Sequence, residues 1–264
     1  MGIKGKYRAF IIDLDGVVYL LNDPLPGAIE ALRRLSENGV PFVFLTNNSS
    51  TSPEQYAGKL HGMGLEVEPD AFVTSGQAVA CHLSERWPEG GARAFVIGEE
   101  GLTRQVEGAG LSLLEPVDSR GADVVVVGWD RAFDFEKLKA AVVAIRNGAY
   151  FVATNGDSTY PTPEGLWPGA GALVAAVSTG AGTEPYVAGK PNPLMVELAL
   201  ERMGARRGET LLVGDRLDTD VAVGLAAGVD TLLVLTGISS LEEVEATGIR
   251  PTSVAGSLAE ALLD

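Results

Sequence analysis

Short apolar runs alternate along the chain with longer segments in which apolar residues recur every three or four positions. The short runs predict buried strands, and the longer segments predict helices that pack on them. The predicted strands are 8–13, 41–46, 71–74, 92–97, 123–127, 150–154, 210–213 and 231–234, and the predicted helices are 27–38, 53–61, 135–147, 193–203 and 219–227. Strands that alternate with helices are typical of parallel sheets with crossover helices. We therefore expect an α/β protein.

Composition narrows the class of protein. The 264-residue chain is long enough for one large domain or two modest ones. Its 20 Lys and Arg against 35 Asp and Glu give a net charge of −15, which opposes binding to nucleic acid or to an anionic membrane surface. Cys81 is the single cysteine, so we expect no internal disulfide and a reducing, cytoplasmic setting. His61 and His82 lack the spacing of metal ligands.

Two carboxylates, Asp13 and Asp15, follow the first predicted strand. Ligands of open α/β sheets bind at the carboxyl ends of strands. Two acids at this spacing can share a divalent cation, or divide the roles of nucleophile and acid/base between them. A turn with solvated aspartates explains the motif by itself about as well. A calcium loop fits less well, because Val17 occupies a position that needs an oxygen ligand.

Polar residues also follow the second predicted strand, and a lone lysine precedes a later helix. The segment 46–50 offers five hydrogen-bonding side chains and its backbone amides to an anion, although it also reads as a polar loop capping the helix at Pro53. The compact charge of Lys190 suits a phosphoryl oxygen or a crowd of carboxylates, although an isolated lysine is ordinarily a surface residue. The candidate anion ligands are Thr46, Asn47 and Asn48.

Three aspartates, Asp215, Asp218 and Asp220, follow the predicted strand 210–213. Their mutual repulsion needs a cation or a lysine nearby, so this cluster and Lys190 explain each other. Asp218 also fits the N-cap of the next helix, whereas Asp215 and Asp220 have no such simple role. If these four polar segments converge at the ends of the strands, one edge of the sheet holds a cation site, a nucleophile, an acid/base and anion ligands.

Together the four motifs resemble those of the haloacid dehalogenase (HAD) superfamily. The match is closest to the phosphatase branch with a large C2-type cap, which includes NagD-like and 4-nitrophenylphosphatase-like proteins, and it covers essentially the whole chain. It implies a Rossmann-like, doubly wound parallel sheet core with an inserted α/β cap domain. The implied core is 1–78 and 186–264, and the implied cap is 79–185. The matching motifs are Asp13-Leu14-Asp15-Gly16-Val17, Leu45-Thr46-Asn47-Asn48, Gly189-Lys190-Pro191, and Gly214-Asp215 with Thr219-Asp220.

The resemblance also implies roles. Asp13 would be the nucleophile that becomes an aspartyl-phosphate, Asp15 the general acid and then base, and Lys190 the cation that holds nucleophile and phosphoryl group together. Mg²⁺ would be held by Asp13, Asp215 and the main-chain carbonyl of Asp15, with Asp220 behind them near Lys190. Thr46, Asn47 and Asn48 would bind the phosphate.

In the implied cap, five residues are candidates to line the substrate cleft: Trp129, Asp130, Arg131, Asn155 and Asp157. Related proteins often read Asn-Pro-Asp where this chain has Gly156 in the middle, which leaves the loop shape and the substrate preference open. Caps of this type commonly form dimer contacts, so the resemblance also implies a homodimer.

The resulting hypothesis is a Mg²⁺-dependent phosphatase. It would act on small phosphorylated metabolites of the sugar phosphate, nucleoside monophosphate, glycerol phosphate or phosphoglycolate class, with neither nucleic acid nor membrane as a partner. One alternative is a phosphotransferase or mutase of the same fold. Another is a catalytically silent protein that binds a phosphometabolite, although a binder has no need for both an attacking and a proton-transferring carboxylate.

Overall fold

The computed structural model describes residues 3–263. The chain packs into two compact units. Of the described residues, the first unit contains 3–46, 53–73 and 190–263, and the second contains 47–52 and 74–189. These units are defined by how densely their residues contact one another. The predicted boundaries between core and cap, at 78/79 and 185/186, stay a prediction.

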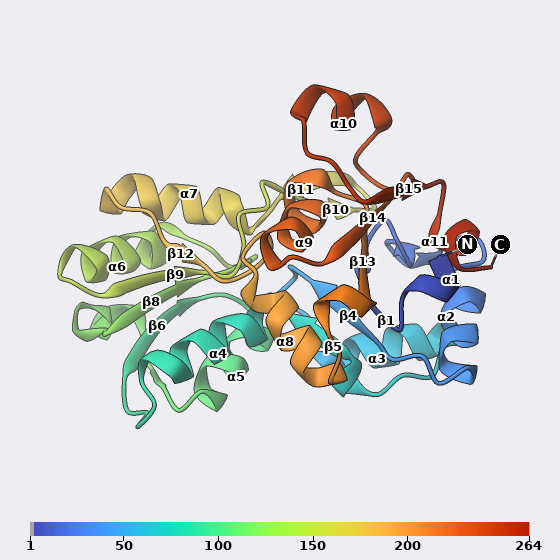
Figure 1. Ribbon diagram of the computed structural model, residues 1–264. Coiled ribbons are helices and arrows are strands. Elements are labelled where there is room, and N and C mark those ends of the chain that lie inside the picture. Colours follow the sequence, from blue (N-terminus) through green and yellow to red (C-terminus); the bar gives the residue numbers. More distant parts are fainter. Residues whose placement is uncertain (1–2, 264) are drawn as a thin grey trace. The chain divides into compact units, whose positions relative to one another are not determined.

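A six-stranded sheet forms the centre of the first unit, in the order β15-β14-β13-β1-β4-β5 (Figure 1). Its strands are β1 (Ala9–Ile12), β4 (Phe42–Thr46), β5 (Phe72–Thr74), β13 (Thr210–Gly214), β14 (Asp230–Val234) and β15 (Ser253–Ala255). β1 pairs in parallel with both β13 and β4 and is buried along its whole length. Burial on both faces explains its uninterrupted apolar sequence.

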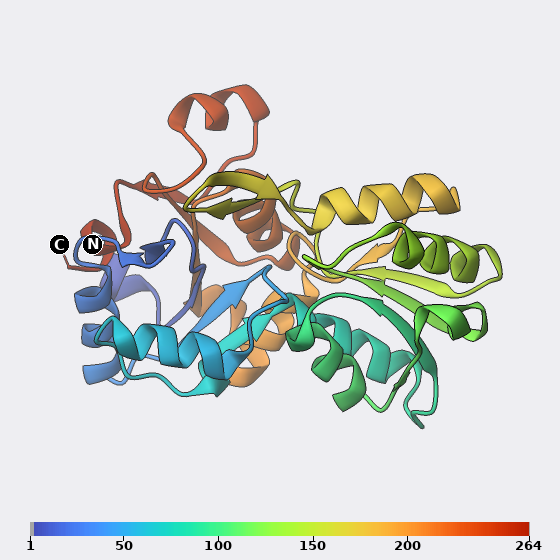
Figure 2. The same cartoon turned by 180° about the vertical axis from the view of Figure 1, so that it is seen from behind.

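Helices cover both faces of this sheet. Figures 1 and 2 show α8 and α9 on one face and α2 and α3 on the other. Phe44 of β4 stacks on Phe72 of β5 with ring centroids 5.0 Å apart, within the core beneath α2 and α3. The helices of this unit are α1 (Ile3–Lys6), α2 (Ala28–Glu37), α3 (Pro53–Gly62), α8 (Leu194–Met203), α9 (Ala222–Ala227), α10 (Leu241–Thr247) and α11 (Leu258–Leu263). A short hairpin, β2 (Tyr19–Leu20) and β3 (Asp23–Pro24), follows β1.

The second unit has a parallel sheet of its own, in the order β12-β9-β8-β6-β7. Its strands are β6 (Arg93–Ile97), β7 (Ser112–Leu113), β8 (Val124–Val127), β9 (Tyr150–Ala153) and β12 (Tyr186–Val187). Within this unit α6 (Phe135–Arg146) and α7 (Ala170–Ala181) cover one face, and α4 (Ser75–Arg86) and α5 (Glu100–Gly108) cover the other (Figure 1). A hairpin of β10 (Thr159–Thr162) and β11 (Gly165–Pro168) precedes α7.

The predicted fold class is confirmed: a parallel α/β core sheet is interrupted in sequence by a second parallel sheet. All eight predicted strands are present, with bounds shifted by a residue or so. The predicted helix 219–227 is partly wrong, because residues Leu217–Val221 form a π-type turn and α9 begins only at Ala222. Within the described range, no helix is long and apolar enough to cross a bilayer.

Candidate active site

Strand register brings three of the predicted motifs to one edge of the core sheet. Ile12, the last residue of β1, lies beside Val213 of β13 and Phe44 of β4. The residues that follow these three positions therefore leave the sheet at the same level. This places Asp13 and Asp15, Thr46, and Asp215 at a common edge, as expected for the carboxyl ends of parallel strands.

A buried lysine links the carboxylates at this edge. The Nζ of Lys190 donates to Asp13 Oδ1 at 2.6 Å, to Asp220 Oδ1 at 2.6 Å and to the carbonyl of Leu45 at 3.2 Å. The lysine side chain is only 3% exposed. An ammonium group has three protons to donate, and each of these three acceptors can take one. Lys190 is thus a fixed bridge between the end of β1, the end of β4 and the turn after β13.

Close backbone approach requires glycine beside the aspartates. Gly16 has φ +79°, and a Cβ at this position would come within 2.6 Å of Asp215 Oδ2. A Cβ on Gly214 would come within 2.2 Å of the Asp220 Cβ. Larger residues would displace the carboxylates, so both motif glycines have a steric reason for their place. The backbone N–H of Ile238 also donates to Asp215 Oδ2 at 2.8 Å, which orients this carboxylate.

The cluster is short of positive charge. Burial raises the pKa of Asp13 well above its usual range, and the charges of Asp220 and Asp215 add to the rise although Lys190 opposes it. Burial, with the neighbouring Asp220, raises the pKa of Asp215 to about 7. Burial alone would lower the pKa of Lys190, but Asp13 and Asp220 raise it above its ordinary value, so the lysine stays charged. Lys190 bonds to two of the three clustered carboxyl groups, and buried carboxylates favour a further cation.

The donor set fits a divalent cation that prefers oxygen ligands. Carboxylate oxygens of Asp13, Asp215 and Asp220 all lie within 4.8 Å of one another. Asp220 already uses one oxygen for Lys190 and the other for the backbone N–H of Arg216, at 3.1 Å. Asp13 and Asp215 are therefore the better ligands, and Mg²⁺ typically takes one or two carboxylates. The Asp15 carboxylate is not part of this group; the role of its main-chain carbonyl stays a prediction.

Asp15 occupies a different environment from Asp13. Its backbone bridges to Tyr19, and the N–H of Gly16 donates to the Tyr19 carbonyl at 2.9 Å, so the chain turns here into the β2–β3 hairpin. Burial raises the pKa of the Asp15 carboxyl, while Lys59 and Lys190 oppose the rise. A carboxyl group with a raised pKa can keep a proton for donation. Lys59 was not anticipated, because nothing distinguishes it from other helix-surface lysines in the sequence.

Asp218 does not cap a helix, so this part of the prediction was wrong. Its carboxylate accepts from Arg216 Nε at 3.0 Å and Nη2 at 2.7 Å. The aspartate side chain is 65% exposed. The π-type turn at 217–221 starts before this residue, so Asp218 lies within the turn instead of at its beginning. Asp218 is a surface ion-pair residue in a run whose other two aspartates are buried.

The second unit contains a separate network of amides. The carbonyl of Asn47 accepts from Asn155 Nδ2 at 2.7 Å and from Ser75 Oγ at 2.5 Å. Asn47 Nδ2 donates to Asp157 Oδ2 at 3.2 Å, and Asn48 Nδ2 donates to the hydroxyl of Tyr160 at 3.4 Å. The predicted residues Asn47, Asn155 and Asp157 thus come together and fix the segment that follows Thr46 directly in the chain. Phosphate binding by Asn47 and Asn48 stays a prediction.

The remaining predicted cap residues lie on one loop. Trp129 packs against Tyr160 with ring centroids 4.6 Å apart, and its Nε1 donates to the Pro168 carbonyl at 2.9 Å. Arg131 pairs with Glu99, at 2.6 Å for the closest N–O pair. Asp130 is buried and accepts from Lys137 Nζ at 2.7 Å and from the backbone N–H of Ala132 at 2.8 Å, so its charge holds the loop together. Their role in lining a substrate cleft stays a prediction.

The chain is similar in sequence to known proteins over nearly its whole length. A haloacid dehalogenase-like hydrolase profile matches residues 10–112, and a HAD-hydrolase-like profile matches residues 187–261. An acid sugar phosphatase from Staphylococcus aureus is 39% identical over 259 residues, which cover 98% of both chains.

Two solved structures extend the comparison. A 4-nitrophenylphosphatase from Thermotoga maritima is 39% identical with a TM-score of 0.90, over 98% of this chain and 97% of that one. A glycerol phosphate phosphatase from Mycobacterium tuberculosis, solved in complex with magnesium, is 37% identical with a TM-score of 0.92, over 100% of this chain and 79% of that one.

Proposed function

Because the chain belongs to the haloacid dehalogenase-like hydrolases and is a phosphatase of that family, we propose that it hydrolyses small phosphomonoesters through an aspartyl-phosphate on Asp13. The bridge from Lys190 to Asp13 and Asp220 is the observation that carries the proposal. A carboxylate fixed by a buried cation, with a second acid two residues later, is what in-line phosphoryl transfer to a carboxylate needs.

The reaction divides between two carboxyl groups. Asp13 attacks phosphorus and forms a new P–O bond while the bond to the leaving oxygen breaks, and Asp15 gives its proton to that oxygen. Asp15, now a carboxylate, then takes a proton from water as the water attacks the phosphorus of the aspartyl-phosphate. Asp13 is released as a carboxylate, and inorganic phosphate leaves. The raised pKa of Asp15 suits the first of these proton transfers.

Several groups would stabilise the negative charge of the phosphoryl group. Lys190 reaches Asp13 from the side of Asp220, and so keeps the nucleophile from being repelled by an incoming dianion. A Mg²⁺ ion held by Asp13 and Asp215 would neutralise phosphoryl oxygens and so stabilise the charge that shifts in the transition state. Thr46, buried at the end of β4, and the neighbouring Asn47 are the proposed phosphate ligands.

Substrates of the sugar phosphate or glycerol phosphate class are supported by the relatives, which are named for sugar phosphate, 4-nitrophenyl phosphate and glycerol phosphate. Nucleoside monophosphates and phosphoglycolate belong to the same proposed range. The proposal also includes a homodimer through the cap, and a cytoplasmic location, with which a single cysteine, Cys81, is consistent.

Phosphate release tests this function. We expect the wild type to hydrolyse 4-nitrophenyl phosphate only with Mg²⁺, and to lose activity reversibly in EDTA. Asp13→Asn should lower kcat by at least ~10⁴-fold, because it removes the nucleophile. Asp218→Asn is the matched control: it changes an aspartate that pairs with Arg216 at the surface, so activity should stay near the wild-type level.

A panel of phosphorylated metabolites, assayed with and without an added alcohol acceptor, then defines the substrate. An inert wild type across the panel would contradict the phosphatase proposal. Transfer of the phosphoryl group to the acceptor with little free phosphate would favour a phosphotransferase. Tight binding of a metabolite without turnover would favour a silent binding protein.

A further inference from the structure

Lys59 of α3 lies against the turn that follows the acid/base residue. Its Nζ is 3.5 Å from the centroid of the Tyr19 ring and donates to the carbonyl of Leu21 at 2.6 Å. Tyr19 is fully buried. Lys59 is half-buried and follows Tyr56 by three residues and precedes Leu60, and both of these neighbours are buried in the core of the same unit.

The turn that Lys59 contacts is a short hairpin. Its strands β2 and β3 contain only two residues each. Leu21, which accepts the hydrogen bond from Lys59, has φ +55°, in the left-handed region that disfavours residues other than glycine. Such a conformation persists where surrounding contacts impose it. The hydrogen bond and the cation–π contact from Lys59 are contacts of this kind.

The same turn sets the position of Asp15. The backbone of Asp15 bridges to Tyr19, and Gly16 bonds to the Tyr19 carbonyl. Among residues 3–263, the Asp15 carboxylate has no side-chain hydrogen bond and no ion pair, so neither fixes its orientation. The positive charge of Lys59 also acts on this carboxyl.

We propose that Lys59 is a positioning residue for the reaction: it fixes the turn 16–21 and holds the Asp15 carboxyl where it can protonate the leaving oxygen. This inference rests on the proposed function, because it assigns Asp15 the role of general acid. Lys190 contacts the nucleophile Asp13, and Lys59 contacts the turn that follows the proton donor Asp15. The phosphatase would thus use two lysines for two carboxyl groups.

The dependence of kcat/KM on the leaving group distinguishes a positioning role of Lys59 from a merely structural one. An alcohol such as glycerol leaves poorly and needs a proton from Asp15, whereas 4-nitrophenolate leaves without one. The ratio kcat/KM, which covers the steps up to aspartyl-phosphate formation, should therefore fall by ~100-fold for glycerol phosphate in Lys59→Met, and by less than about fivefold for 4-nitrophenyl phosphate. Lys59→Arg, which keeps the charge, should recover part of the loss with the alkyl ester.

Two further variants keep this test interpretable. Lys59→Gln, which can donate a hydrogen bond but carries no charge, replaces Lys59→Met if that protein fails to fold, and the same unequal losses are expected. Lys6→Met is the matched control, because Lys6 also lies over a tyrosine ring, that of Tyr7, and pairs with a carboxylate, that of Asp230. It should change neither rate.

Equal losses for both esters in the Lys59 variants, or no loss for either, would overturn the inference while leaving the phosphatase proposal intact. Failure of the proposed function would look different, since the wild type would then hydrolyse neither ester.

Discussion

The two units are built on similar sheets but carry different polar residues at their strand ends. β1 of the first unit and β8 of the second are both four-residue strands buried at every position. β1 is followed by Asp13, whereas β8 is followed by Gly128 and the aromatic Trp129. The first unit thus gathers buried charges, and the second gathers amides around Asn47 and Asn155. A parallel sheet provides the edge, and the residues beyond the strands decide its chemistry.

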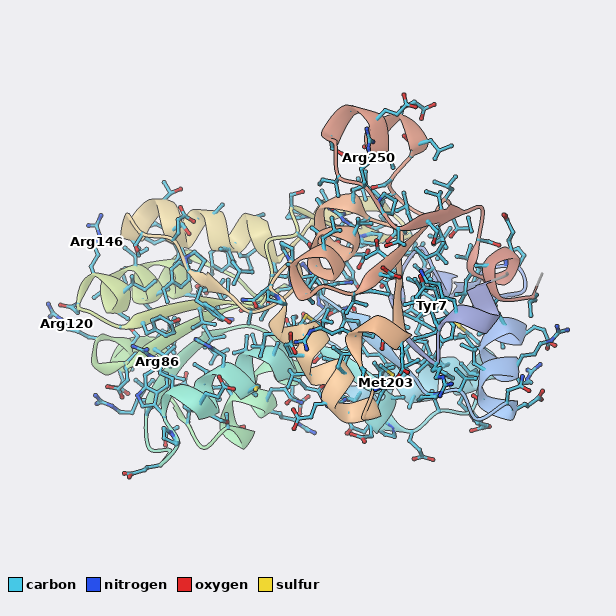
Figure 3. The ribbon with its side chains drawn as sticks, viewed as in Figure 1. Tyr7, Arg86, Arg120, Arg146, Met203 and Arg250 are labelled. Carbon is cyan, nitrogen blue, oxygen red and sulfur yellow. The ribbon has the colours of Figure 1, made fainter. Side chains whose placement is uncertain are left out.

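The basic residues of the two units also differ in their surroundings. Lys190 is 3% exposed and lies between two carboxylates with a third close by. In the second unit the arginines Arg86, Arg120 and Arg146 lie at its surface (Figure 3). Lys137 is the nearest counterpart to Lys190, since it pairs with the buried Asp130 at 2.7 Å, but that pair contains a single carboxylate. We interpret the pair of Lys137 and Asp130, with one charge of each sign, as structural. We interpret the cluster of Lys190 with three carboxyl groups as catalytic.

Replacing each lysine gives the largest expected difference between the units. Lys190→Met should lower kcat/KM for 4-nitrophenyl phosphate by about 10³-fold, because a preorganised cation at the nucleophile is lost. Lys137→Met should leave kcat/KM within about threefold but lower the free energy of unfolding by ~1–3 kcal/mol, because Asp130 is left buried without its partner. Steady-state kinetics and urea unfolding of both proteins measure the two effects. Comparable activity losses in the two variants would show that the distinction between the units is wrong.

A smaller effect is expected from the amide network of the second unit. Asn155→Ala removes the hydrogen bond to the carbonyl of Asn47, the residue after Thr46. Losing a buried hydrogen bond costs ~1–3 kcal/mol, so loosening this segment, which we propose binds phosphate, should lower kcat/KM by about tenfold or more. Asn147→Ala is the control, because Asn147 is exposed and donates to the carbonyl of Val143 in α6, the helix whose C-terminus it caps. Equal kcat/KM values for the two variants would show that the amide network does not contribute to phosphate binding.

Strands and their polar ends could be predicted because long buried strands have a clear apolar signature. β1, β4 and β13 are four or five residues long and almost wholly apolar, and their carboxyl ends indicated Asp13, Thr46 and Asp215. The shortest strands left no such signal. β12 and β7 contain two residues each, and the β2–β3 hairpin gave no alternation long enough to recognise.

Tertiary contacts made by ordinary residues could not be predicted. Lys59 and Tyr160 belong to no motif; they matter because folding brings them to Tyr19 and to Asn48. Asp218 illustrates the opposite error, since local spacing suggested a cap and Arg216 formed an ion pair with it instead. Sequence patterns therefore indicated which strand ends bring polar side chains together, but not which neighbours contact them.

The most direct test of the account is to trap the phosphorylated nucleophile. In Asp15→Asn, 4-nitrophenyl phosphate should still phosphorylate Asp13, because its leaving group needs no proton, while hydrolysis should be slow without a base. We predict a burst of one 4-nitrophenol per protein molecule in stopped flow, with a phosphoryl group located by mass spectrometry on the peptide that contains Asp13. A burst without phosphate on that peptide, or phosphate on another residue, would contradict the account.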